Sequence, residues 1–235
     1  MSKTEAGKEN WILGDEVHKH LVSLGLETPM VDDTRMDFAT EGEEGMSNRK
    51  AQLEHMTAQM MNTMGLDLKD DSLEETPKRV AKMWINELMW GLDYSNFPKV
   101  TVVENKIQYD EMVLERNITV QSMCEHHLLP ILGTAHVAYI PTKKVPGLSK
   151  INRVVDFFCR RPQIQERLTA QIYHTLCYLL DSENVAVCIT AEHLCVKMRG
   201  VQDACSDTVT SKLGGDFRSH GGARREFFNL INVNK

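Results

Sequence analysis

Two short segments of the chain are dense in side chains that bind metals. They are Cys124-Glu125-His126-His127 and His193-Leu194-Cys195, so five of these seven residues carry a thiol or an imidazole. The sequence contains no Cys-x-x-Cys pair, the usual mark of a structural zinc site. Two cysteines and one histidine would give zinc three ligands and leave one position open for water. The pattern therefore indicates a zinc hydrolase.

The same pattern leaves two histidines for proton transfer, since imidazole titrates near physiological pH. The spacing alone does not say which histidine binds the metal. Buried cysteines and histidines are also often purely structural. We give that interpretation to the four cysteines without an adjacent histidine, which are Cys159, Cys177, Cys188 and Cys205.

Length, charge and cysteine content narrow the class of protein. The 235 residues are enough for one domain, or for one domain with a helical extension, and for a sizeable core. The net charge of −6 argues against a nucleic-acid or anionic-membrane surface. A polar N-terminus and the lack of a long apolar run predict no targeting or membrane segment. Six cysteines without a disulfide framework predict a cytoplasmic protein.

Helical signals dominate residues 1–96, which we expect to form an N-terminal helical region. The first ten residues are predicted to be disordered, residues 11–26 to form a helix, and the acidic residues 32–44 to form a linker. Thr76 is predicted to cap a further helix, with Pro77 in its first turn. Two apolar stripes at helical spacing are predicted to be buried, namely Val17, Leu21 and Leu24, and Leu53, Met56, Met60 and Met64.

Residues 97–235 are expected to form the catalytic domain. Ser149 is predicted to cap a helix over residues 150–160, and Pro162 to open a longer helix. That helix would bury Ile164, Leu168, Ile172, Leu176 and Leu179. β-branched residues with partial alternation predict antiparallel strands at Val100–Tyr109, Met112–Met123 and Gly133–Ile140.

A last strand is predicted over residues 184–198, and its alternation would bring His193 and Cys195 onto one face. Cys124 and His127 are three residues apart and would point in opposite directions on a regular strand. We therefore expect the chain to turn between them at the end of a strand.

Four motifs together resemble the GTP cyclohydrolase I family, and the likeness runs from about residue 15 to the C-terminus. They are Cys124-Glu125-His126-His127, Gly147-Leu148-Ser149-Lys150, Arg161-Pro162-Gln163-Ile164-Gln165-Glu166-Arg167-Leu168-Thr169 and His193-Leu194-Cys195-Val196-Lys197. The resemblance implies an α+β tunnelling fold, in which helices back an antiparallel sheet, with an N-terminal helical extension. It also implies GTP as substrate, Zn²⁺ as cofactor, and a homodecamer of two stacked pentamers.

The resemblance assigns the roles that spacing leaves open. It makes Cys124, His127 and Cys195 the zinc ligands and places His126 and His193 beside the reacting purine. Ser149 and Glu125 complete the predicted catalytic set.

Glu166 is the residue predicted to recognise guanine. The base presents a ring N–H and an amino group along one edge, and one carboxylate can accept both. Glu166 lies about 200° around the helix from Ile164, away from the predicted buried face, and Gln165 can add hydrogen bonds. Without the family resemblance, Glu166 would be taken for an ordinary surface carboxylate.

An acidic protein needs a local basic cluster to bind a triphosphate. Lys150, Arg153 and Arg199, with Arg79 from the helical region, match the family's phosphate-binding positions, although each alone is more often a surface charge. In the family, Arg153 and Arg79 reach sites on neighbouring subunits. The resemblance therefore implies that catalysis requires the oligomer.

The implied reaction begins with attack of zinc-activated water on carbon 8 of guanine. His193, assisted by His126, would give a proton to nitrogen 7 as the imidazole ring opens. A second hydrolysis releases formate, and ribose opening, an Amadori-type rearrangement and closure give 7,8-dihydroneopterin triphosphate. This would be the first step of tetrahydrofolate or pterin biosynthesis.

Three alternatives remain. GTP cyclohydrolase II would bring a three-cysteine motif with a long first gap, which this sequence lacks. Pyruvoyl-tetrahydropterin synthases use three histidines on zinc, and the cysteines here argue against them. A zinc-stabilised oligomeric module could bind a nucleotide or pterin without turnover.

Met198 and Cys205 stand where the family leads us to expect smaller or hydroxyl residues, which puts reactivity or pocket shape in question.

Overall fold

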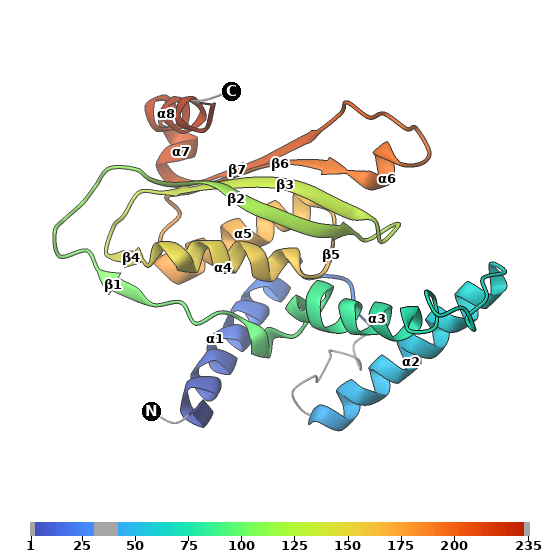
Figure 1. Ribbon diagram of the computed structural model, residues 1–235. Coiled ribbons are helices and arrows are strands. Elements are labelled where there is room, and N and C mark those ends of the chain that lie inside the picture. The colour runs from blue at the N-terminus through green and yellow to red at the C-terminus, as the bar shows by residue number, and fades with distance from the viewer. Residues whose placement is uncertain (1–2, 31–41, 233–235) are drawn as a thin grey trace.

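The computed structural model describes residues 3–30 and 42–232, and helices precede its main sheet (Figure 1). The helix α1 begins at Lys3, so the prediction of ten disordered residues was wrong for the described part of that segment. Lysine, glutamate and alanine in this segment are good helix formers. Residues 32–41 of the expected linker lie outside the described residues, and residues 42–44 belong to α2. The helical elements are α1 (Lys3–Ser23), α2 (Gly42–Thr63), α3 (Thr76–Met83), η2 (Trp84–Leu88), η3 (Trp90–Leu92) and η4 (Tyr94–Asn96).

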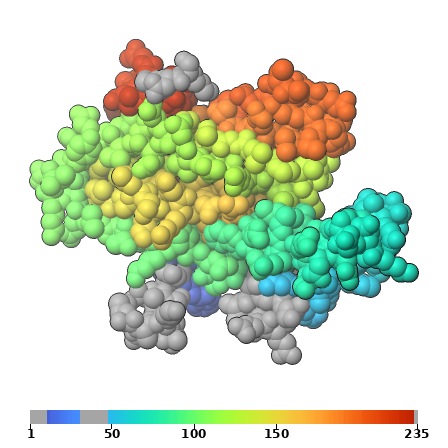
Figure 2. Space-filling view, viewed as in Figure 1, coloured from blue at the N-terminus to red at the C-terminus, as the bar shows by residue number. Residues whose placement is uncertain are grey.

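The methionine stripe of α2 is exposed rather than buried. Met56 and Met60 of α2, and Met64 just after its end, have exposed fractions of 61, 56 and 62%, whereas Thr57 and Met61 are buried. The α2–α3 pair extends away from the sheet, so that within one chain α2 packs mainly against α3 (Figures 1 and 2). Helical spacing was predicted correctly, but the buried face was not.

The first and third helices differ in detail from the prediction. Val17 and Leu21 are buried as predicted, but Leu24 is exposed because α1 ends at Ser23, just before it. Pro77 does lie in the first turn of α3, but the N-cap is Glu75 and not Thr76.

The main sheet has the strand order β5-β2-β3-β6-β7. All its neighbours are antiparallel except β5, which runs parallel to β2. Separate helices and a mostly antiparallel sheet place the fold in the α+β class. The five strands are β2 (Val113–Cys124), β3 (Pro130–Tyr139), β5 (Pro162–Gln163), β6 (Val185–His193) and β7 (Thr208–Leu213). A second, two-stranded sheet joins β1 (Val102–Glu104) to β4 (Lys144–Pro146), so only part of the strand expected over residues 100–109 forms.

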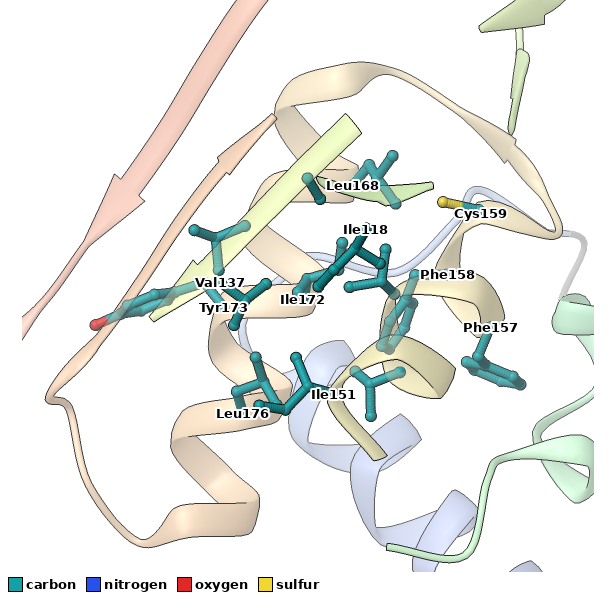
Figure 3. Close-up of a cluster of buried hydrophobic side chains, with 14 of the residues drawn as sticks. Ile118, Val137, Ile151, Phe157, Phe158, Cys159, Leu168, Ile172, Tyr173 and Leu176 are labelled. Carbon is teal, nitrogen blue, oxygen red and sulfur yellow. The ribbon is translucent and has the colours of Figure 1, made fainter. Parts of the chain in front are cut away.

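Two helices cover one face of the main sheet, namely α4 (Leu148–Cys159) and α5 (Gln165–Leu180). Their apolar side chains meet those of β2 and β3 in the core (Figure 3). Leu168, Ile172, Leu176 and Leu179 are buried as predicted, whereas Ile164 is only half-buried. Val17 and Leu21 of α1 join the same core. The division of the chain at residue 97 stays a prediction.

The starts of α4 and α5 correct two predictions. Gly147 and not Ser149 is the N-cap of α4, because the helix already begins at Leu148. Pro162 belongs to β5, and α5 begins only at Gln165, with Ile164 as its N-cap. The two residues of β5 pair with the end of β2, so the helix begins only after them.

The other face of the sheet packs against α7 (Gly215–Ser219) and α8 (Gly221–Asn232), through Phe217 and Phe227. Strand β6 is therefore buried on both faces along most of its length. In the described part of the chain, no helix is both long enough and apolar enough to cross a bilayer.

Candidate metal and substrate site

The three predicted metal ligands converge at one end of the sheet. Cys124 is the last residue of β2, His127 lies in the turn to β3, and Cys195 lies in α6 (Leu194–Lys197), directly after β6. Because Ile131 of β3 pairs with His193, α6 follows at the end where the β2–β3 turn lies (Figure 1). The ligand atoms of the three residues lie within 4.8 Å of one another.

The turn between Cys124 and His127 was predicted, and two hydrogen bonds hold it. The Cys124 N–H donates to the Leu129 carbonyl (2.8 Å), and the Leu128 N–H donates to the Cys124 carbonyl (2.8 Å). Leu128 has a φ of 54°, a left-handed conformation that non-glycine residues adopt mainly under local constraint. The prediction for Cys195 was wrong in detail, since the strand ends at His193 and Cys195 reaches the cluster from a helical turn.

The chemistry of these donors suits zinc. Thiolate and imidazole are typical zinc ligands, and tetrahedral bonds of about 2.0–2.3 Å place the ligand atoms roughly 3.3–3.8 Å apart. Atoms already within 4.8 Å need only small rotations to reach that spacing. Among the residues with described side chains, no fourth Cys, His, Asp or Glu joins the cluster. A tetrahedral zinc ion bound by these three residues would keep one coordination position open.

His193 is held beside the cluster by a buried glutamine. Its Nε2 lies 2.7 Å from Oε1 of Gln165, and the Gln165 amide nitrogen contacts the Ile189 and Thr208 carbonyls. Those carbonyls can only accept, so they orient the amide and leave its oxygen to accept from His193. Neutral His193 therefore carries its proton on Nε2. Burial lowers the pKa of His193, and the charge of Glu166 opposes that shift.

The other predicted catalytic residues occupy the β2–β3 turn or the start of α4. His126 is exposed, with Nδ1 3.8 Å from the Cys124 sulfur. The Glu125 carboxylate forms an ion pair with Arg167, a residue that sequence reasoning did not select. Arg167 stood inside a recognised motif, but no sequence signal links it to Glu125.

Glu166 points away from the core, as predicted. It is exposed in the first turn of α5 and borders a hollow of about 170 Å³, whose other lining residues include Thr169, Thr210 and Lys212. The amide of Gln165 is already engaged by protein partners, so the guanine contact predicted for Gln165 stays a prediction.

The predicted phosphate-binding residues do not all meet in one chain. Arg199 reaches the cluster, where its guanidinium contacts Nε2 of His127. Ser149, Lys150 and Arg153 lie in the first turns of α4, at the β4 end of the sheet and away from α6 (Figure 1). Arg79 is exposed on α3.

Fold and cluster together define an α+β protein with three candidate metal ligands gathered at one end of its sheet. The family model for GTP cyclohydrolase I matches residues 53–232, and the chain belongs to this family. Its curated relatives include proteins named GTP cyclohydrolase 1 from three bacteria. The protein of Vibrio cholerae is 55% identical over 203 residues, covering 86% of this chain and 89% of the relative. That of Edwardsiella ictaluri is 52% identical over 92% of this chain and 94% of the relative, and that of Aeromonas salmonicida is 54% identical over 90 and 93%.

Proposed function

We propose that this protein converts GTP to 7,8-dihydroneopterin triphosphate and formate, the first step of tetrahydrofolate or pterin biosynthesis. The observation that carries the proposal is the convergence of Cys124, His127 and Cys195 beside His193, in a chain of this family. We propose Zn²⁺ as the cofactor held by these three residues. When bound, zinc supplies Lewis-acid activation of the water that attacks carbon 8 of guanine.

Substrate binding and proton transfer are assigned to residues of the chain itself. Glu166 accepts the ring N–H and amino group of guanine, a role that its exposure at the start of α5 supports. His193 takes up on Nδ1 a proton that the attacking water loses and passes it to nitrogen 7, with His126 assisting. Its Nε2–H stays bonded to Gln165, which fixes the orientation of the ring. Ser149 acts at the ribose. Lys150, Arg153, Arg199 and Arg79 neutralise the triphosphate.

We further propose that each active site combines residues from several chains of a homodecamer, two stacked pentamers of the tunnelling fold. Three observations support this. Ser149, Lys150 and Arg153 belong to the first turns of α4, and Figure 1 shows α4 beginning beside β4, away from α6. Within the described chain, no strand pairs with the outer side of β7, and β5 pairs with β2 only at its last two residues. Such free edges invite pairing with another copy. The methionine face of α2 is also exposed and apolar.

We propose a cytoplasmic location, supported by the six cysteines, none of which forms a disulfide.

The variant His193→Ala tests the chemistry. It should keep zinc and bind GTP, yet yield neither formate nor a fluorescent oxidised pterin. Normal turnover by this variant would exclude His193 as the proton donor. A protein that binds GTP and never turns it over, even as wild type, would instead be the binding module considered above.

Mixing inactive variants tests the shared site. Arg153→Ala should weaken triphosphate binding, and subunit exchange with His193→Ala should restore activity in mixed sites that contain both intact residues. The matched control is a mixture of His193→Ala with Cys195→Ser, because both residues come from the same stretch of one chain. That mixture should stay inactive. Confirmed exchange without recovery in the first mixture would exclude sites that join His193 and Arg153 from different chains.

A further inference from the structure

Arg167 is a largely buried cation in the first turn of α5, and its partners all lie beside the ligand cluster. Its side chain is 10% exposed. One terminal nitrogen contacts the Glu125 carboxylate and lies 3.2 Å from the Pro162 carbonyl, while Nε lies 3.2 Å from Oε1 of Gln163. A guanidinium is a rigid planar fork, so three acceptors around it fix its position.

Glu125 is tied to the same segment twice. Its N–H donates to the Gln163 carbonyl (3.0 Å), and its carboxylate receives Arg167. Glu125 directly follows the predicted ligand Cys124 and precedes His127 by two residues. Its anchoring therefore sets where the turn begins, and with it the separation of the two ligands.

The first turn of α5 holds three parts of the site through consecutive residues. Gln165 contacts His193, Glu166 is exposed at the surface hollow, and Arg167 holds Glu125. A displacement of this turn would move the histidine, the guanine-recognising carboxylate and the metal-binding turn together.

We propose that Arg167 is a positioning residue that acts through Glu125. It holds the Cys124–His127 turn in the geometry that binds the metal and links that turn to the helix carrying Glu166. The inference rests on the proposed function, since it takes the Cys124, His127 and Cys195 cluster to be the zinc centre.

The test measures zinc release to an excess of chelator, without GTP, followed by the steady-state kinetics of GTP turnover. Arg167→Gln and Glu125→Gln should each lose zinc about 10- to 100-fold faster than the wild type, the usual effect of removing a group that orients metal ligands. The KM for GTP should change less than about threefold in Arg167→Gln, because Arg167 is assigned no contact with substrate. The double variant should lose zinc no faster than the worse single variant, because both substitutions break the same ion pair.

Arg167→Lys keeps the positive charge but lacks the planar guanidinium, so its rate of zinc release should lie between those of the wild type and Arg167→Gln. It replaces Arg167→Gln in the test if that variant does not fold. The matched control is Arg160→Gln, which removes an arginine from an ion pair with Asp156 (2.8 Å) and should leave zinc release unchanged. The proposal would be overturned if both Arg167 variants released zinc at the wild-type rate. It would also be overturned if the effects of Arg167→Gln and Glu125→Gln on the rate of zinc release multiplied in the double variant. A wild type that binds no zinc would also overturn it. A wild type that holds zinc but does not consume GTP would contradict only the proposed function and not the positioning role of Arg167.

Discussion

The variant Gln165→Leu should show whether the Gln165 side chain supports His193 or binds the substrate. The Gln165 side chain is 1% exposed and uses both ends of its amide. Its oxygen faces His193, and its nitrogen contacts the Ile189 and Thr208 carbonyls and the Thr210 hydroxyl at 3.1, 2.8 and 3.1 Å. Leucine has a similar volume but satisfies none of these groups.

The expected loss of stability follows from those contacts. The amide offers two N–H donors to three acceptors, and its oxygen accepts one further hydrogen bond, which makes about three net interactions. At roughly 1 kcal/mol each, the free energy of unfolding should fall by about 2–4 kcal/mol. Urea unfolding at a fixed protein concentration measures it, because an oligomer's stability depends on concentration.

The expected loss of activity is larger in kcat than in KM. Proton transfer by a positioned group is typically worth about 10²–10⁴-fold, so a His193 ring that is present but unsupported should lower kcat about 10- to 100-fold. The KM for GTP should change less than about threefold, because the Gln165 amide already has protein partners. A large rise in KM with an unchanged kcat would instead make Gln165 a direct substrate ligand.

Gln171→Leu is the matched control. Gln171 is another fully buried glutamine of α5, donates to the Leu26 carbonyl (2.7 Å) and accepts from Gln163 (2.8 Å), but does not contact His193. It should lose a comparable 2–3 kcal/mol, at about 1 kcal/mol for each hydrogen bond, and keep kcat within about threefold. Equal losses of kcat in the two variants would show that destabilisation, and not the His193 contact, explains the result.

Three further results are expected. Cys124→Ser, His127→Ala and Cys195→Ser should each lose zinc and activity, and metal analysis that finds full zinc with normal turnover in any of them removes that residue from the ligand set. Glu166→Gln should weaken GTP binding far more than zinc binding. The wild type should prefer GTP over ATP on the order of 10⁴-fold, since adenine lacks the paired donors, and equal affinities for GTP and ATP would contradict this. Arg161→Met should destabilise the fold by about 3–5 kcal/mol in urea, because it removes a fully buried guanidinium that pairs with Glu27 at 3.1 Å and donates to the Gly91 carbonyl. An unchanged unfolding midpoint would refute this.

A candidate metal cluster formed by residues 124–127 and 193–195 could be predicted because residue type carries its chemistry, whereas the choice of His127 over His126 came from the family resemblance. A cysteine and a histidine three residues apart require a turn, and the structure contains that turn. The route of Cys195 could not be predicted in the same way, because a continued alternation and a helical turn after His193 both bring it to the cluster. Only the hydrogen bonds of α6 distinguish them.

Burial was predicted best where a helix packs within its own chain. The stripe of α5 lies on the sheet and is buried, whereas Met56 and Met60 have the same spacing on α2 and are exposed. Periodicity gives the apolar face of a helix but not what covers it. Ser149 and Lys150 show a similar limit, since the resemblance names them as site residues without saying which chain supplies them. For Arg153 the resemblance itself implies a neighbouring subunit.

The most direct test of the proposed function is the production of formate and a fluorescent oxidised pterin from GTP, measured before and after zinc is removed with a chelator. Both products should form with the zinc-loaded protein, disappear after chelation and return when Zn²⁺ is added back. Turnover that persists in metal-free protein would contradict the role of the Cys124, His127 and Cys195 cluster. Zinc-loaded protein that binds GTP and releases no formate would contradict the proposed reaction.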